Sequence, residues 1–182
     1  NMALSTIGTN SIADDAVTSA KTETGLMTTT DQFRLTTAFS ATASSEQVIS
    51  SNLERVDTSG QGTLGSAMTE SSGVFTFPST GIYLVRYGLY TFDNSVWTYC
   101  YSKIQVTTNN SSYTNVAYGS TSMTGTMTNY PEQSCLIDTL VDVTDTSNVK
   151  VRFVYHTPET ISISGDTNIN RTYFTFMRLG DT

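Results

Sequence analysis

Short apolar and polar segments follow one another along most of this chain. Residues 82–92 are almost continuously apolar, which is typical of a strand buried on both faces, whereas residues 135–143 alternate between apolar and polar. Turn-forming residues interrupt the runs about every ten residues, a spacing that predicts an all-β sandwich or barrel without a long amphipathic helix. The expected strands lie at 34–39, 48–56, 73–77, 82–92, 96–106, 135–143, 149–155, 161–163 and 172–179, with a weaker one at 116–127.

The first 35 residues have a different pattern. Residues 5–21 read STIGTNSIADDAVTSAK and contain no aromatic residue. Their apolar residues follow neither a helical nor a strand period, and they are too few to bury a core of their own. We therefore expect two parts, an N-terminal attachment or assembly arm over residues 1–35 and a head domain over residues 36–182.

Composition and charge narrow the range of partners. The chain has 23 serines and 34 threonines among 182 residues, and threonine, being β-branched, favours strands. Nine basic residues against 16 acidic ones give a net charge of −7. Because no basic stripe is available to neutralise phosphates, we expect neither a nucleic-acid partner nor an anionic membrane partner. No run of about 18 apolar residues is present that could span a membrane.

Few residues suit catalysis. A Ser-His-Asp or Cys-His arrangement would need His156, the single histidine, and neither a G-x-S-x-G elbow nor a P-loop is present. A carboxylate pair for glycoside cleavage stays open, because such a pair need not be close in sequence. We expect a protein that is not an enzyme and that carries no cofactor.

The residues that could bind metal are sparse. Cys100 and Cys135 could pair if their strands meet, but lone cysteines usually behave as small apolar residues, so we expect free buried thiols. No CxxC motif or Cys/His cluster indicates zinc. Asp142 and Asp145 flank a turn and residues 14–15 are both aspartate, yet no D-x-D-x-D-G loop is present. We expect solvated carboxylates rather than calcium ligands.

Tyrosine is abundant, with ten in the chain. Tyr113, Tyr118 and Tyr130 fall in Ser/Thr/Asn-rich segments that we expect to be loops, where binding residues concentrate. An aromatic ring face can stack on the C–H groups of a sugar, so these three are candidates for host or glycan binding. The alternative is that they are ordinary exposed loop tyrosines.

The string SGVFTFPSTGIYLV at residues 72–85 resembles the signature of complement 1q-like and tumour necrosis factor-like jelly rolls. The pattern Gly-x-Phe-x-x-Pro-x-x-Gly-x-Tyr is matched by Gly73, Phe75, Pro78, Gly81 and Tyr83. Residues 140–155 and 172–180 resemble later strands of the family, although residues 147–148 are Ser-Asn where the family usually has Gly-Asp. The resemblance covers residues 36–180 and implies a jelly-roll β-sandwich that assembles as a homotrimer.

This resemblance gives a role to the aromatic residues of the run at 96–106. With a period of two, one face carries Trp97, Tyr99 and Tyr101, large side chains with polar tips of the kind enriched at interfaces. We expect Trp97, Tyr99 and Tyr101, together with Tyr87, to line the trimer interface. The alternative is that they pack beneath loops of their own domain.

The N-terminal string IGTNSIADDAVTSAK resembles a repeat of tail-fibre and other virion structural proteins of tailed bacteriophages, particularly those of cyanobacteria. Ile7, Gly8, Ile12, Val17 and Lys21 are among the matching positions, and one copy is present. The resemblance implies an extended arm that docks on other virion proteins through Ile7, Ile12 and Val17, with the head on the exterior of the particle.

Together the two resemblances imply a non-enzymatic virion structural protein. Its trimeric jelly-roll head, at a fibre tip or capsid protrusion, would attach to a host cell-surface glycan or protein by multivalent binding. Two alternatives stay open, a capsid decoration protein that stabilises the shell and a secreted bacterial carbohydrate-binding or adhesion module. A small hydrolase is a further class, which would need His156 or the glutamates Glu46, Glu54, Glu70, Glu132 and Glu159.

Overall fold

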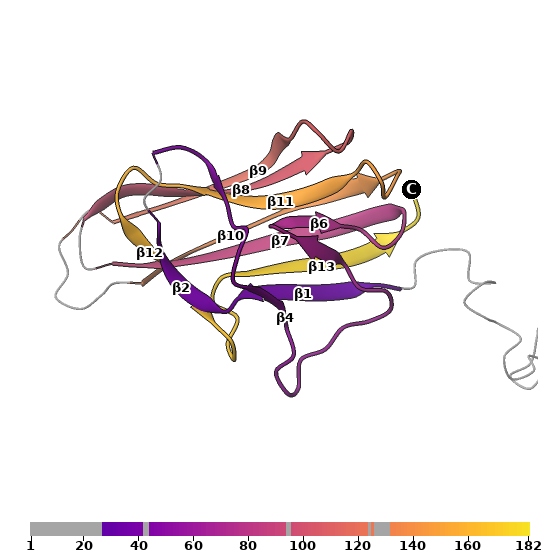
Figure 1. The fold of residues 1–182 in the computed structure, drawn as a ribbon, viewed down its shortest axis with the longest axis horizontal. Coiled ribbons are helices and arrows are strands. Elements are labelled where there is room, and N and C mark those ends of the chain that lie inside the picture. The colour runs from indigo at the N-terminus through magenta and orange to yellow at the C-terminus, as the bar shows by residue number, and fades with distance from the viewer. Residues whose placement is uncertain (1–26, 42–43, 94–95, 124, 126–131) are drawn as a thin grey trace, which may run out of the picture.

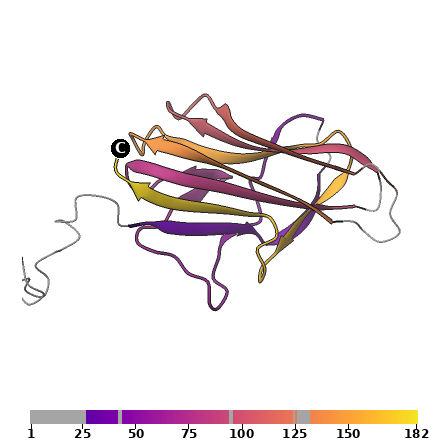
Figure 2. The same cartoon turned by 180° about the vertical axis from the view of Figure 1, so that it is seen from behind.

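A computed structural model describes residues 27–41, 44–93, 96–123, 125 and 132–182. In these residues, thirteen strands form two antiparallel sheets that pack face to face (Figure 1, and from behind Figure 2). Sheet A contains β1 (Thr30–Leu35), β2 (Thr37–Ala41), β4 (Leu53–Arg55), β7 (Gly81–Phe92), β10 (Glu132–Val143), β12 (Ile161–Asp166) and β13 (Tyr173–Gly180). Sheet B contains β3 (Gln47–Val48), β5 (Thr69–Ser71), β6 (Val74–Thr76), β8 (Trp97–Thr107), β9 (Thr114–Met123) and β11 (Lys150–His156).

Strand β7 is the centre of sheet A. Strand β10 pairs with its whole length on one side, while β13 and β12 share the other side. Strand β1 adds to β13, and β4 adds to β1. In sheet B, β8 lies between β11 and the edge strand β9. The edge strands β9 and β10 approach each other closely, since a Cβ added to Gly119 would lie 2.5 Å from Cys135 Sγ.

Aromatic rings fill the space between the two sheets. The ring of Phe75 lies 5.1 Å from those of Phe33 and Phe176, and Phe153 stacks on Phe174 with 4.0 Å between ring centroids. They alternate with outward-facing residues along their strands, as the two-residue period requires. Because each fully buried ring contributes about 1.5–3 kcal/mol, this cluster joins the sheets into one core.

Strand β1 corrects the expected boundary between arm and head. Its six residues belong to sheet A, with Thr30 to Arg34 opposite β13 and Phe33 and Leu35 in the core. The head therefore begins no later than Thr30 rather than at residue 36, because these apolar side chains complete the sandwich. Residues 1–26, including Ile7, Ile12 and Val17, lie outside the described residues.

Two of the aromatic side chains expected at a trimer interface belong to the core instead. Trp97 is 1% exposed and Tyr87 is fully buried. The pairing of β8 with β9 shifts register between Trp97 and Cys100, and this irregularity brings Trp97 to the inner side together with Cys100. Tyr87 lies on the inner face of β7 against Phe153 and Phe174. The prediction of an interface role is therefore wrong for both residues.

Candidate interaction surfaces

The outer face of sheet A exposes a row of apolar side chains. Leu140 of β10, Leu84 of β7 and Met177 of β13 stand opposite one another across three strands. Leu140 is 62% exposed, and Leu136, on the same side of β10, is 56% exposed. Directly opposed residues in antiparallel strands point to the same side, so these four side chains share one surface, which we call the apolar face. Exposed apolar side chains gathered on one face mark a candidate site of interaction.

An ion pair crosses the apolar face. Arg86 and Asp138 stand opposite each other, one row away from Leu84 and Leu140, and Arg86 Nη2 lies 3.2 Å from Asp138 Oδ2. Arg86 Nε is buried and donates no hydrogen bond to the described residues. The ion pair therefore separates Leu140 from Leu136 on this face.

A pocket of about 250 Å³ opens on sheet A beside the apolar face. We call it the Gly88 pocket, because Gly88 lines it together with Tyr90, Leu136 and Tyr173. A Cβ at Gly88 would lie 2.5 Å from Cε1 of Tyr173, so any other residue would force that ring to move. Gly88 and Leu84 are four residues apart on β7, which places the pocket about 13 Å from the apolar row.

Polar side chains line the rest of the Gly88 pocket. Ser134 comes from β10, and Asn170 comes from the segment between β12 and β13. Asn170 Nδ2 donates to Gln32 Oε1 at 2.6 Å, which fixes the amide. Asn170 Oδ1 is buried and accepts no hydrogen bond within the described part of the chain. This oxygen is covered by the protein itself and is not open to a ligand in the pocket.

Arg171 lies at the edge of the Gly88 pocket. Its guanidinium carbon is 5.7 Å from the ring centroid of Tyr90, and its nitrogens lie 3.9 Å from Glu132 and 3.8 Å from Asp166. A hydrogen bond with Glu132, and then burial, raise the pKa of Tyr90. The two carboxylates offset the charge of Arg171, so the pocket offers hydrogen-bond donors without a net positive field.

The outer face of sheet B carries the tyrosine cluster, formed by Tyr99, Tyr101, Tyr118 and His156. Tyr99 and Tyr101 stack with 4.1 Å between ring centroids, and the His156 ring meets both at 5.6 and 5.8 Å. Tyr118 of β9 lies 4.9 Å from Tyr101 and is 55% exposed. Two expected interface residues and one expected glycan-binding residue therefore meet on one surface.

A polar network continues from the tyrosine cluster along sheet B. Lys103 pairs with Glu46, whose second oxygen accepts from Gln105 Nε2 at 2.9 Å. The hydrogen bond and charge of Lys103, helped by Gln105, hold the pKa of Glu46 below its usual value in spite of its desolvation. Beyond Gln105, the guanidinium carbon of Arg152 lies 3.9 Å from the ring centroid of Tyr113. Tyr113 is therefore held under an arginine and is separate from Tyr118.

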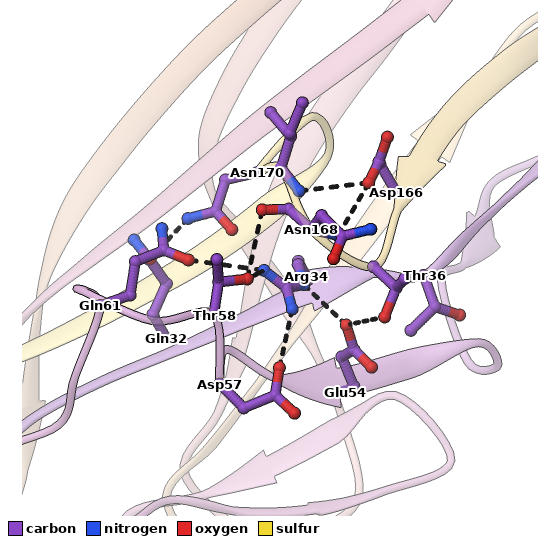
Figure 3. A network of polar contacts seen from close by, with 12 residues as sticks. Gln32, Arg34, Thr36, Glu54, Asp57, Thr58, Gln61, Asp166, Asn168 and Asn170 are labelled. Carbon is purple, nitrogen blue, oxygen red and sulfur yellow. Dashed lines mark hydrogen bonds and ion pairs between the residues drawn. The ribbon is translucent and has the colours of Figure 1, made fainter.

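A buried arginine organises the outer face of sheet A towards its β4 edge (Figure 3). The side chain of Arg34 is fully buried and donates to Glu54 at 2.7 Å, to Asp57 at 2.9 Å and to Thr58 at 2.7 Å. Thr58 in turn donates to the carbonyl of Asn168 at 3.2 Å. These bonds hold the segments after β4 and β12 against the outer face of β1. The arginine serves the fold and leaves this part of the sheet covered.

The residues considered for catalysis or metal binding have other partners. His156 belongs to the tyrosine cluster. Glu46 is paired with Lys103 of sheet B, and Glu54 is paired with Arg34 of sheet A. Asp145 caps its own turn by accepting from the Ser147 N–H at 2.7 Å. Within the described ranges, no three His, Cys, Asp or Glu side chains are grouped to hold a metal ion, and no helix is long and apolar enough to cross a membrane.

The sequence reasoning missed the apolar face and the Gly88 pocket. The alternation at 135–143 was visible, but leucine at 136 and 140 occupies the side where a solvent-facing strand would carry polar residues. That departure was a usable signal. No sequence signal placed Asn170 and Tyr90 together, because they lie far apart in the chain. Tyr130 lies outside the described residues.

Comparisons with known proteins establish the fold. No protein-family model matches the chain, and no curated protein matches it. Among solved structures, Eiger TNF from S. frugiperda matches with a TM-score of 0.62 and 13% identity, over 86% of this chain and 96% of that one. Murine APRIL at pH 5.0 matches with a TM-score of 0.61 and 12% identity, over 83% of this chain and 98% of that one. The expected tumour necrosis factor-like jelly-roll sandwich is confirmed.

Proposed function

We propose that this chain is a non-enzymatic structural protein of a phage particle. Its jelly-roll head would form a homotrimer on the exterior of the virion and attach to a host cell-surface glycan or protein. The fold supports the homotrimer, because tumour necrosis factor-like domains typically form homotrimers. The resemblance of residues 7–21 to phage virion repeats supports the place on a phage particle, with Ile7, Ile12 and Val17 docking on other virion proteins.

The observation that carries the proposal is the apolar face of sheet A. Leu136 and Leu140 are more than half exposed in the single chain, next to Leu84 and Met177. A soluble protein rarely leaves such a surface uncovered, and a second copy of the chain would cover it. We therefore place self-association on sheet A. The contact is heterologous, since three copies close into a ring when each presents this face to a different surface of its neighbour.

The trimer would explain attachment through weak individual sites. Once one of three equal sites on a rigid head has bound a crowded surface, the other two meet their ligand at a high effective concentration. The trimer therefore binds more tightly than a single site does. The arm would leave the head beside the apolar face, because Thr30, near the first described residue, stands opposite Met177.

The test is the native mass of the purified chain by light scattering, with and without residues 1–26. We expect a trimer in both cases, because the apolar face lies on strands within the described residues. A trimer that is lost with the arm would move assembly to residues 1–26. A monomer in both cases would contradict self-association through the apolar face in solution.

The alternatives predict different results on particles and cells. A decoration protein would stabilise the shell, so particles without it would lose heat resistance while adsorbing to cells normally. A secreted bacterial adhesion module would be monomeric and absent from purified virions. Adsorption that falls when the chain is deleted, with the chain detected by antibody on intact particles, supports the attachment role.

A further inference from the structure

We propose that the tyrosine cluster on the outer face of sheet B binds one neutral pyranose unit of a cell-surface glycan. The inference deepens the proposed attachment function and rests on it. Covering the apolar face of a chain leaves the cluster of that chain open, because the two lie on the outer faces of different sheets. The apolar face of a neighbouring copy fits the cluster poorly, since its leucines would bury the ion pair of Lys103 with Glu46 against aliphatic groups.

The rings of the tyrosine cluster hold one another in place before any ligand binds. Tyr99 and Tyr101 stack with 4.1 Å between ring centroids and 13° between ring planes, and the His156 ring makes a T-shaped contact with both. Tyr118 packs on Tyr101 at a tilt of 49°. Because a tyrosine side chain has few torsions to fix, a surface of packed tyrosines loses little entropy on binding. The cluster is therefore a preformed platform.

Tyr118 supplies the exposed ring of this platform. It is 55% exposed on the edge strand β9, where it stands opposite Lys103 of β8. A pyranose has C–H groups across one face, and these fit the electron-rich face of an aromatic ring. Lys103 Nζ lies 5.7 Å from the centroid of the same ring. A sugar stacked on Tyr118 would therefore have charged groups beside its rim.

The ion pair beside Tyr118 matches the hydroxyls at the rim of a sugar. Glu46 is paired with Lys103 and accepts from Gln105 Nε2 at 2.9 Å, yet its side chain is still 38% exposed. A carboxylate has about four acceptor sites and an ammonium has about three donors, so the pair has capacity left beyond these bonds. Each sugar hydroxyl can both donate and accept, so adjacent hydroxyls can bond to the carboxylate and to the ammonium. Hydrogen bonds of this kind are strengthened by the charge of the protein group.

Charge favours a neutral sugar over a charged one. Lys103 and Glu46 offset each other, while the chain as a whole has a net charge of −7. An acidic sugar would therefore meet Glu46 in a negative field. A cationic ligand would compete with Lys103, whose Nζ already lies 6.0 Å from the ring centroid of Tyr101 and 5.7 Å from that of Tyr118. A neutral sugar avoids both penalties.

The experiment is saturation-transfer difference NMR on the full chain with free D-glucose, D-galactose and D-mannose, and with D-galacturonic acid for comparison. We expect transfer to the C–H protons of at least one neutral hexose at millimolar concentration, and at least fivefold less to the acid. Tyr118→Ala removes the exposed ring and should reduce the signal at least fivefold, whereas Tyr118→Phe keeps the ring and should retain most of the signal. Glu46→Ala removes the acceptor beside the ring and should reduce the signal as well.

Tyr113→Ala is the matched control, because it makes the same change at a tyrosine outside the cluster. The ring of Tyr113 lies under Arg152, with 3.9 Å between the guanidinium carbon and the ring centroid. We expect Tyr113→Ala to keep the signal. A signal that survives Tyr118→Ala, or one that Tyr113→Ala removes to the same extent, would overturn the proposal. Circular dichroism of each variant checks that the sandwich is intact.

Further outcomes separate this site from the attachment function. If no neutral hexose gives a signal while deletion of the chain still lowers adsorption of particles to cells, the assignment of the tyrosine cluster is wrong and the attachment role stands. If Tyr118→Ala breaks the trimer, a neighbouring copy occupies the cluster and the sugar proposal falls. A signal that depends on Tyr118, from a chain that antibody does not detect on intact particles, would keep the sugar site and remove the phage attachment role.

Discussion

The ring of Tyr173 lies against Gly88 so closely that a Cβ at position 88 would come within 2.5 Å of its Cε1 and 2.9 Å of its Cζ. The two residues stand opposite each other on β13 and β7. A glycine within a central strand weakens the sheet, because it packs no side chain and loses more entropy on folding. Its presence here indicates that the close approach of the Tyr173 ring requires the missing side chain.

Replacing Gly88 by alanine should therefore destabilise the fold. The added methyl group would push the Tyr173 ring from its position, and forced repacking of this kind costs about 1–3 kcal/mol. Urea unfolding followed by tryptophan fluorescence measures the change. Gly62→Ala is the matched control, since a Cβ there meets no atom within 4 Å, and its effect should stay within about 0.5 kcal/mol. Equal effects of the two substitutions would contradict the packing argument.

The buried guanidinium of Arg34 gives a second prediction. Arg34→Ala would leave Glu54 without its cation and open a cavity under the loop segments, a combination that costs about 3–5 kcal/mol. Asp57→Asn, which changes the other carboxylate partner, should cost less than about 1 kcal/mol because the Asp57 side chain is 80% exposed. Thermal and urea unfolding of the two variants test the order. A larger loss in Asp57→Asn would contradict it.

The same pair predicts a pH dependence. Burial raises the pKa of Glu54, but hydrogen bonds from Arg34 and Thr167 and the charge of Arg34 outweigh it, so the folded pKa lies below the ordinary value of 4.5. The pairing therefore contributes fully above pH 4.5 and is lost as the pH falls through the lower folded value. Glu54→Gln should be less stable than the wild type at pH 7, with a gap that narrows below pH 4. A gap that is constant with pH would show that this carboxylate does not titrate as proposed.

Local pattern predicted the architecture well and the surfaces poorly. The apolar run at 82–92 and the turn before it predicted β7, because a strand that is buried on both faces is apolar along most of its length. The inner position of Trp97 could not be predicted, since it depends on a register shift between β8 and β9 that only their pairing reveals. The Gly88 pocket could not be predicted either, because Tyr90, Ser134 and Asn170 become neighbours only when three distant segments meet.

Substitution of Leu140 tests the apolar face directly. Leu140→Arg places a charge at the centre of the expected contact, where a neighbouring copy would have to bury it unpaired. We expect the native mass to fall from trimer to monomer, while the midpoint of urea unfolding of the isolated chain changes little because Leu140 is 62% exposed. Val116→Arg, at a valine that is 44% exposed on β9 of sheet B, is the control and should stay trimeric. A Leu140→Arg trimer would remove the apolar face from the interface.

The two cysteines should differ in reactivity. Both are free, with Cys100 buried in the core and Cys135 half-buried on β10. Burial, and then the neighbouring Cys135, raise the pKa of Cys100 to about 12, so at pH 8 its thiolate is present at only about one part in ten thousand. Iodoacetamide at pH 8 should therefore modify Cys135 first in the native protein. In about 6–8 M urea, where we expect the chain to be unfolded, it should modify both residues equally. Mass spectrometry of tryptic peptides measures the two rates. Modification of Cys100 at the rate of Cys135 in native conditions would mean that the edge between β9 and β10 opens readily and exposes the core.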